Sequence, residues 1–228
     1  MFWRFGNYAN VSTLDSILDK PDVTLEDLLD ESDLIQELKQ HNSKLIEYLR
    51  DEKILRRLLE YVIAPEAPKA EDAGEDDSED EQPIKEKSLS PFRRSKENRG
   101  KTRRQEQREE WDKADKARQK NAFIASEILS SETWSIIESL MEHQHHLRTF
   151  WDFLNREPPL EATVAGYFTK VNETLLDKKT EETLQFVKTQ PNVVPAILKH
   201  VDCPMIMDLL LKIISMEKSE GGMGIVDV

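Results

Sequence analysis

The sequence contains two runs of short amphipathic helical segments, separated by a charged stretch that has too few apolar residues to form a core. In residues 12–63 and 121–216, apolar side chains recur three and four positions apart, with frequent interruptions by Pro, Asp, Asn, Ser or Thr. This spacing places apolar side chains on one face of a helix. Glycine is scarce, with 7 residues in 228, and β-branched runs are few, which favours helix over sheet. The sequence therefore predicts an all-α fold.

Residues that cap helices mark several of the predicted boundaries. Thr24 precedes a segment with acidic residues in its first turn, and Asn42 precedes a stripe of apolar residues. The predicted helices of the first run are short, and isolated helices below roughly 12–15 residues are marginal in water. They must therefore bury their apolar faces against each other, in a bundle or an α-solenoid.

The last predicted helix, residues 205–216, is apolar on nearly every side. A helix of this kind belongs in a protein interior and needs another layer over it. The residues that follow, 217–228, are polar and glycine-rich and supply no such layer. We therefore expect an exposed hydrophobic surface at this end of the helical array, which would promote association.

The charged stretch between the two runs has an acidic half and a basic half. Residues 66–81 contain nine acidic residues and one lysine, a net charge of −8, whereas residues 85–120 contain fourteen Lys or Arg and seven acidic residues, a net charge of +7. With so little apolar surface to bury, we expect this insert to be disordered. From about Glu106 to Lys120 the charges interleave around Trp111, which indicates a solvated helix that leads into the second run.

The basic half allows two interpretations. It could contact nucleic acid, or its arginines and lysines could form a nuclear-localisation patch. The alternative is a solvated linker whose two oppositely charged halves attract each other. The net charge of the whole chain, −13, argues against general nucleic-acid binding.

Four serines of the insert are candidate phosphorylation sites. Ser78 precedes three acidic residues, Ser90 precedes a proline, Ser95 follows two arginines, and Ser88 lies in the same segment. A phosphate would meet no packing penalty in a disordered segment.

Composition also limits the compartment and the kind of protein. No apolar run approaches the roughly 20 residues that a bilayer span requires, and the first residues lack the pattern of a secretory signal. A single cysteine, Cys203, excludes an internal disulfide and fits a reducing compartment. We therefore expect a soluble intracellular protein without a membrane partner.

No constellation of residues predicts catalysis or a cofactor. His143, His145 and His146 could suggest zinc, but adjacent residues such as His145 and His146 point apart on a helix, and only one thiol is present. Cys203 precedes a proline at a predicted helix start and is better explained as a small buried residue than as a nucleophile. The sequence has no phosphate-binding loop and no hydrolase or metal-phosphatase motif. We expect no metal, no cofactor and no enzymatic activity.

Several stretches, in order and spacing, resemble a known family. They are the opening Met1-Phe2-Trp3-Arg4-Phe5-Gly6 and residues 14–18, 23–31, 35–37, 42–49, 126–129, 158–160, 166–171 and 207–211. This pattern is similar to that of the SAPS-domain family, the regulatory subunits of the protein phosphatase 6 class of type 2A-like serine/threonine phosphatases.

The resemblance implies a HEAT- or armadillo-like helical-repeat scaffold that binds a phosphatase catalytic subunit and directs it to targets. It implies a role in cell-cycle or nutrient signalling. From composition we expect the chain in the cytoplasm, and also in the nucleus if the basic half acts as a nuclear-localisation patch. The chain would be the N-terminal part of such a domain. We expect a first helical block at 1–64, a disordered insert at 65–120, a second block of the same domain at 121–216, and a flexible end at 217–228.

The terminal aromatics Phe2, Trp3 and Phe5 are candidate partner-binding residues, since aromatic side chains dominate interface hot spots. The alternative is that they fold back over the first helices as a cap. Acidic residues of the first block could set the approach and register of a partner. These residues are Glu26, Asp27, Asp30, Glu31 and Glu37.

Overall fold

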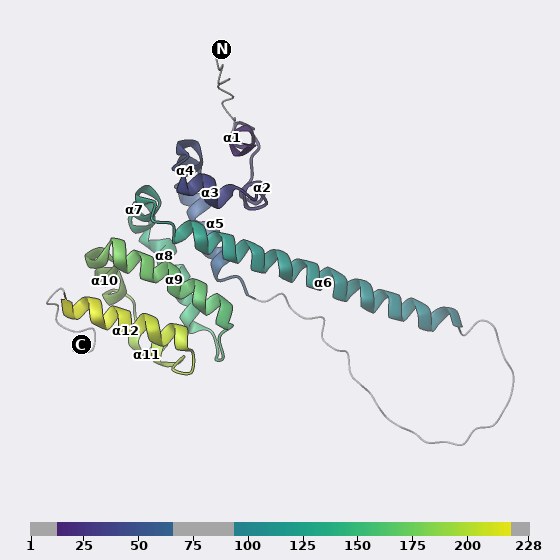
Figure 1. Ribbon diagram of the computed structural model, residues 1–228. Coiled ribbons are helices and arrows are strands. Elements are labelled where there is room, and N and C mark those ends of the chain that lie inside the picture. The colour runs from purple at the N-terminus through teal and green to yellow at the C-terminus, as the bar shows by residue number, and fades with distance from the viewer. Residues whose placement is uncertain (1–12, 66–93, 220–228) are drawn as a thin grey trace, which may run out of the picture. The chain divides into compact units, whose positions relative to one another are not determined.

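The computed structural model describes residues 13–65 and 94–219, with only the backbone for residues 94–105, 107, 218 and 219. Every regular element in these ranges is helical, as the apolar spacing predicted (Figure 1). The first block contains α1 (Thr13–Leu18), α2 (Leu25–Leu29), α3 (Leu34–Lys39), α4 (Ser43–Leu49) and α5 (Glu52–Val62). After it come α6 (Arg94–Leu129), α7 (Trp134–Glu142), α8 (Gln144–Trp151), the 3-10 helix η1 (Asp152–Asn155), α9 (Ala162–Lys178), α10 (Thr180–Lys188), α11 (Val193–Leu198) and α12 (Pro204–Ser219).

Local hydrogen bonds fix the starts of two of the short helices. Thr24 and Asp27 form a reciprocal capping box at α2, in which each side chain accepts from the backbone N–H of the other. The Asn42 side chain accepts from the backbone N–H groups of Lys44 and Leu45 at α4. Both capping residues were predicted from the sequence.

Helix α6 begins earlier than the sequence indicated. Its charge pattern predicted a helix from about Glu106, whereas the helix starts at Arg94. This corrects the expectation that disorder continues to residue 120. Lys, Arg, Gln and Glu are good helix formers, and charges at one-turn spacing add support, as between Arg118 Nε and Asp115 Oδ1 at 2.7 Å. The earlier part of the expected insert, residues 66–93, lies outside the described residues.

The two helical blocks pack together in one compact unit, to which α6 contributes its residues from Lys120 onward, while the earlier residues of α6 belong to a second unit. Contacts that cross between the blocks involve α5 with α7, α8 and α9. The Ser139 hydroxyl of α7 donates to the Arg50 carbonyl at 2.9 Å, and the Arg156 guanidinium donates to the Ile63 carbonyl. The blocks therefore share one hydrophobic core although about sixty residues of sequence separate them.

Aromatic side chains fill the core of the second block. The Phe168 ring of α9 lies 4.8 Å from the Phe150 ring and 5.1 Å from the Phe153 ring, centroid to centroid. Trp151 packs edge-on to both Phe168 and Phe186. Its indole N–H donates to the Asn172 side chain at 2.8 Å, which satisfies a polar group that would otherwise be buried without a partner.

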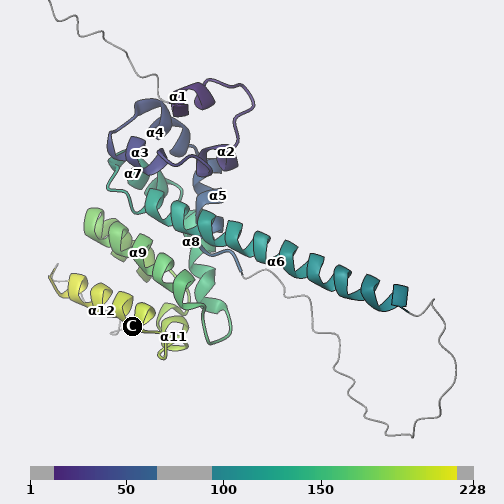
Figure 2. The same ribbon diagram turned by 45° about the vertical axis from the view of Figure 1, so that its right-hand side comes forward.

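Helix α12 lies alongside α9 in both ribbon views (Figures 1 and 2).

No helix among the described residues combines the length and apolar character that crossing a bilayer requires.

Candidate partner-binding surface

Helix α12 buries one face and exposes another that is also apolar. Ile206, Leu209 and Ile213 are buried and are spaced so that they share one helical face. Leu211 and Ile214 are 64% and 41% exposed, on a different face of the same helix. The sequence predicted a helix that is apolar on nearly all sides, and the tertiary packing decides which of those sides meets α9.

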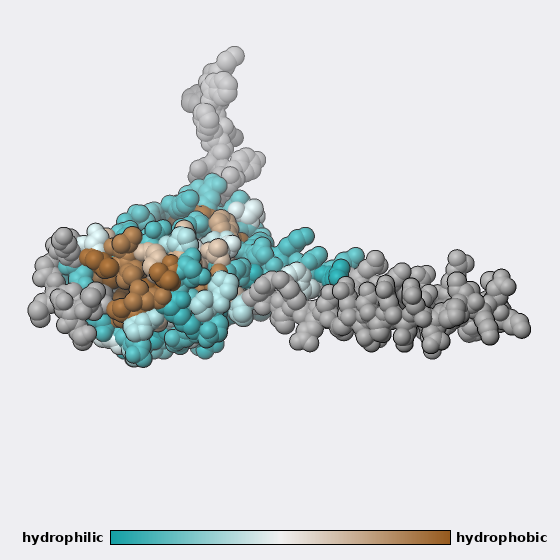
Figure 3. Space-filling model, turned by 90° about the horizontal axis from the view of Figure 1, so that it is seen from below, coloured by the Kyte–Doolittle hydropathy of each residue, from teal (hydrophilic) through white to brown (hydrophobic). Residues whose placement is uncertain are grey.

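Large apolar side chains are also exposed on α11 and in the connection between α11 and α12. Viewed from the side of the unit on which these helices lie, hydrophobic residues gather in one patch (Figure 3). In α11, α12 and their connection, the exposed large apolar residues are Leu198, Val201, Met205, Leu211 and Ile214; we call them the α11–α12 apolar patch. Clustered exposed apolar side chains mark protein contact surfaces, so this patch is the candidate partner-binding surface. It agrees with the expected exposed hydrophobic surface.

The α11–α12 apolar patch predicts self-association of the purified chain. The apparent mass in light scattering should rise with protein concentration, because association removes apolar surface from water. The double variant Leu211→Glu, Ile214→Glu should stay monomeric at the same concentrations and bind less of a hydrophobic dye. Phe123→Glu is the matched control, since Phe123 is 49% exposed but lies on α6; it should associate like the wild type. Equal association of all three proteins would contradict the prediction.

The acidic residues of the first block are mostly engaged within the fold. Glu26 accepts hydrogen bonds from the guanidinium of Arg57 and the hydroxyl of Tyr61, and partial burial followed by this hydrogen bond raises the pKa of Tyr61. Asp30 forms an ion pair with Lys120 of α6, in which Asp30 Oδ1 lies 2.6 Å from Lys120 Nζ. These carboxylates hold the helices of the unit together, so they are less available to steer a partner than the sequence indicated.

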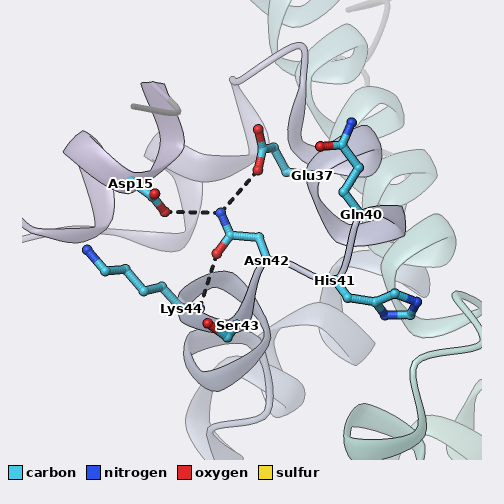
Figure 4. A pocket seen from close by; sticks show the side chains of 7 residues that line it. All are labelled: Asp15, Glu37, Gln40, His41, Asn42, Ser43 and Lys44. Carbon is cyan, nitrogen blue, oxygen red and sulfur yellow. Dashed lines mark hydrogen bonds between the residues drawn. The ribbon is translucent and has the colours of Figure 1, made fainter. Parts of the chain in front are cut away.

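A polar hollow of about 390 Å³ lies where α1, α3 and α4 meet (Figure 4). The Asn42 side-chain amide donates to Asp15 Oδ1 at 3.0 Å and to Glu37 Oε2 at 3.1 Å while its oxygen caps α4. The preceding His41 has a φ of 60°, which allows the tight reversal from α3 to α4. The side chains around this hollow thus form a structural joint, and we do not assign it a ligand.

Several predicted site residues lie outside the described part of the chain. Phe2, Trp3 and Phe5 precede Thr13, and Ser78, Ser88 and Ser90 fall within residues 66–93. Ser95 lies in α6, where only the backbone is described. These proposals therefore stay predictions. Cys203 is buried, with 8% of its surface exposed, in agreement with its interpretation as a small core residue.

The histidines of residues 143–146 lie differently from the expectation. His145 and His146 were expected to point apart, but their ring centroids are 3.8 Å apart and both Nε2 atoms lie near a carboxylate oxygen of Glu52. That expectation is wrong because both residues lie in the first turn of α8, where flexible side chains can reach toward the same group on α5.

Two exposed aromatic residues were not recognised from the sequence. Trp134, the first residue of α7, is 56% exposed, and the Lys179 ammonium lies 4.3 Å from its ring centroid. Phe123 is half exposed and lies 6.3 Å from the ring of Tyr167. A single sequence gives no signal for these positions, because an exposed aromatic and a buried one have the same helical spacing.

The described residues form an all-α fold with exposed apolar side chains on α11 and α12. Residues 172–228 match the family model described as SAPS, SIT4 phosphatase-associated protein. The matched range contains the whole α11–α12 apolar patch.

Similarity to curated proteins extends over nearly the whole chain. The chain is 37% identical over 235 residues to extragenic suppressor of kinetochore protein 1 of Schizosaccharomyces pombe, an alignment that covers 100% of this chain and 23% of that protein. It is 30% identical to SIT4-associating protein SAP190 of Saccharomyces cerevisiae, with 99% of this chain and 23% of that protein covered. It is also 30% identical to serine/threonine-protein phosphatase 6 regulatory subunit 3 of Gallus gallus, with coverage of 94% and 20%. No solved structure matches the chain.

The chain belongs to the SAPS family, as its resemblance to the family indicated. It spans between a fifth and a quarter of the length of these relatives.

Proposed function

We propose that this chain is part of a regulatory subunit that binds the catalytic subunit of a type 2A-like serine/threonine phosphatase. The observation that carries the proposal is the similarity along nearly the whole chain to proteins named for association with SIT4 and for regulation of phosphatase 6. In this role the chain has no catalytic activity of its own. It acts by presenting a fixed surface to the enzyme.

The structure suggests which part of the surface supplies affinity. Interfaces gain most of their free energy from a few desolvated apolar residues, surrounded by polar contacts that add little. The α11–α12 apolar patch provides such residues on a helix that is anchored to α9. The acidic residues of the first block are engaged in internal contacts, so we assign affinity to the patch and only secondary steering to the charged helix faces.

The proposal is tested by capture of a phosphatase 6-class catalytic subunit on immobilised chain. The wild type and Phe123→Glu should retain the catalytic subunit equally, and the double variant Leu211→Glu, Ile214→Glu should retain at least about tenfold less, because two apolar contacts are replaced by charge. A longer chain extended past Val228 is measured in parallel. The immobilised chain alone should not hydrolyse a phosphopeptide.

Each outcome separates one part of the proposal. If neither the chain nor its extended form captures the catalytic subunit, the functional assignment is wrong. Capture by the extended form alone would keep the assignment and place the contact beyond residue 228. Undiminished capture by the double variant would reject the α11–α12 apolar patch as the contact surface.

A further inference from the structure

Three histidines gather around one carboxylate at the junction of the two helical blocks. Glu52 is the first residue of α5, His143 lies between α7 and α8, and His145 and His146 are in the first turn of α8. His145 Nε2 and His146 Nε2 lie 3.3 Å and 3.1 Å from Glu52 Oε1, and His143 Nε2 lies 3.6 Å from Glu52 Oε2. Donor atoms of Glu52, His145 and His146 all lie within 4.8 Å of one another.

The spacing of these atoms is that of ligands around a small tetrahedral ion. Zinc binds imidazole nitrogen and carboxylate oxygen at about 2.0–2.2 Å, so two ligand atoms of a zinc tetrahedron are separated by about 3.3 Å. The separations from Glu52 Oε1 to the two imidazole nitrogens, 3.3 and 3.1 Å, agree with this value. The nitrogens of His145 and His146 lie within 4.8 Å of each other, so the two rings would need to adjust to share one ion.

Neighbouring groups orient His143 and bury most of His146. A backbone carbonyl can only accept a hydrogen bond, so the contact of His143 Nδ1 with the Ser139 carbonyl at 2.8 Å places the proton on Nδ1 when the ring is neutral. The His143 Nε2 lone pair is then free to accept a proton or a metal. The Ser139 hydroxyl in turn donates to the Arg50 carbonyl, two residues before Glu52. His146 is largely buried, with 14% of its side chain exposed.

The charge of the cluster also suits a divalent cation. Neutral imidazoles with one carboxylate carry a net charge of −1, and the His145 and His146 rings are close enough to repel each other if both were protonated. Hydrogen bonds from the imidazoles to Glu52 are the alternative explanation for the short contacts. Imidazole and carboxylate are ligands that suit zinc, and a metal bound by nitrogen and oxygen needs no thiol.

We propose that Glu52, His145 and His146 bind one Zn²⁺, with His143 or a water molecule as the fourth ligand. The ion ties α5 of the first block to α8 of the second. Since the unfolded chain does not assemble these ligands, binding stabilises the folded unit.

The experiment uses the untagged chain, because a polyhistidine tag would itself bind zinc. The chain is first treated with a chelator, which is then removed. Calorimetric titration should then give one bound Zn²⁺ per chain, and added Zn²⁺ should raise the melting temperature. Mg²⁺ at the same concentration should neither bind nor raise the melting temperature. Cobalt(II) should give the visible absorption of a tetrahedral site. His145→Ala with His146→Ala should weaken zinc binding at least about tenfold, as should Glu52→Gln, which keeps the shape of the side chain.

The matched control is His41→Asn, which removes an exposed histidine that is not part of the cluster, at a position whose positive φ suits asparagine; it should bind zinc like the wild type. Circular dichroism checks that each variant is folded. Absence of zinc binding by the wild type would overturn the proposal. So would equal binding by the wild type, the double variant and Glu52→Gln, because the ion would then be held elsewhere, for example by the acidic residues 66–81.

Discussion

Replacement of Phe168 by alanine is expected to lower the free energy of unfolding by about 3–5 kcal/mol. Phe168 is fully buried on α9 and lies among the rings of Phe150, Trp151 and Phe153. Truncation removes apolar surface from the core and leaves a cavity that three rigid neighbours cannot close. Urea unfolding followed by helical circular dichroism and by tryptophan fluorescence measures the change.

The control is Phe123→Ala, in which the same side chain is removed from a position that is 49% exposed. Its expected effect is below about 1 kcal/mol, because most surface substitutions change stability only slightly. If Phe168→Ala were no more destabilising than this control, the described aromatic core would not exist in solution.

Replacement of Asn172 by leucine is expected to cost about 1–3 kcal/mol of stability, although leucine is more apolar than asparagine. The buried Asn172 amide accepts from the Trp151 indole N–H and donates to the Phe168 carbonyl, each at 2.8 Å. Leucine leaves the indole N–H buried without an acceptor, and this desolvated donor is the source of the cost. The same urea unfolding experiment measures it.

A double-mutant cycle distinguishes this cause from poor packing. Adding Trp151→Phe removes the unsatisfied donor, so the Asn172→Leu substitution should cost less in the Trp151→Phe background than in the wild type. Asn155→Leu is the matched control, since the exposed Asn155 amide donates only to the Asp152 side chain on the surface. An identical cost of Asn172→Leu in both backgrounds would rule out the hydrogen bond as the reason.

Local sequence signals were sufficient for the helices and for several of their ends. The capping box of Thr24 and Asp27 and the cap at Asn42 connect residues at most three positions apart, so no tertiary information is needed to predict them. The spacing of three and four positions noted for residues 12–63 also holds in α5, where Leu55, Leu58, Leu59 and Val62 are all buried. The start of α6 was missed because highly charged sequence has good helix propensity yet no apolar stripe to mark its beginning.

The sequence by itself determined that the chain is all-α, which residues form most of its helices, and which family it belongs to. These properties depend on helical spacing, caps and residue order, all of which are local in the chain. Only the tertiary structure decided which face of α12 is exposed and that Trp134 lies on the surface. It also brought Glu52 against His145 and His146, which follow it in the sequence by 93 and 94 positions respectively. The physical reason is that the face a helix buries depends on the neighbouring helices against which it packs. The geometry of that packing depends on every side chain at the contact, and not on any short stretch of sequence.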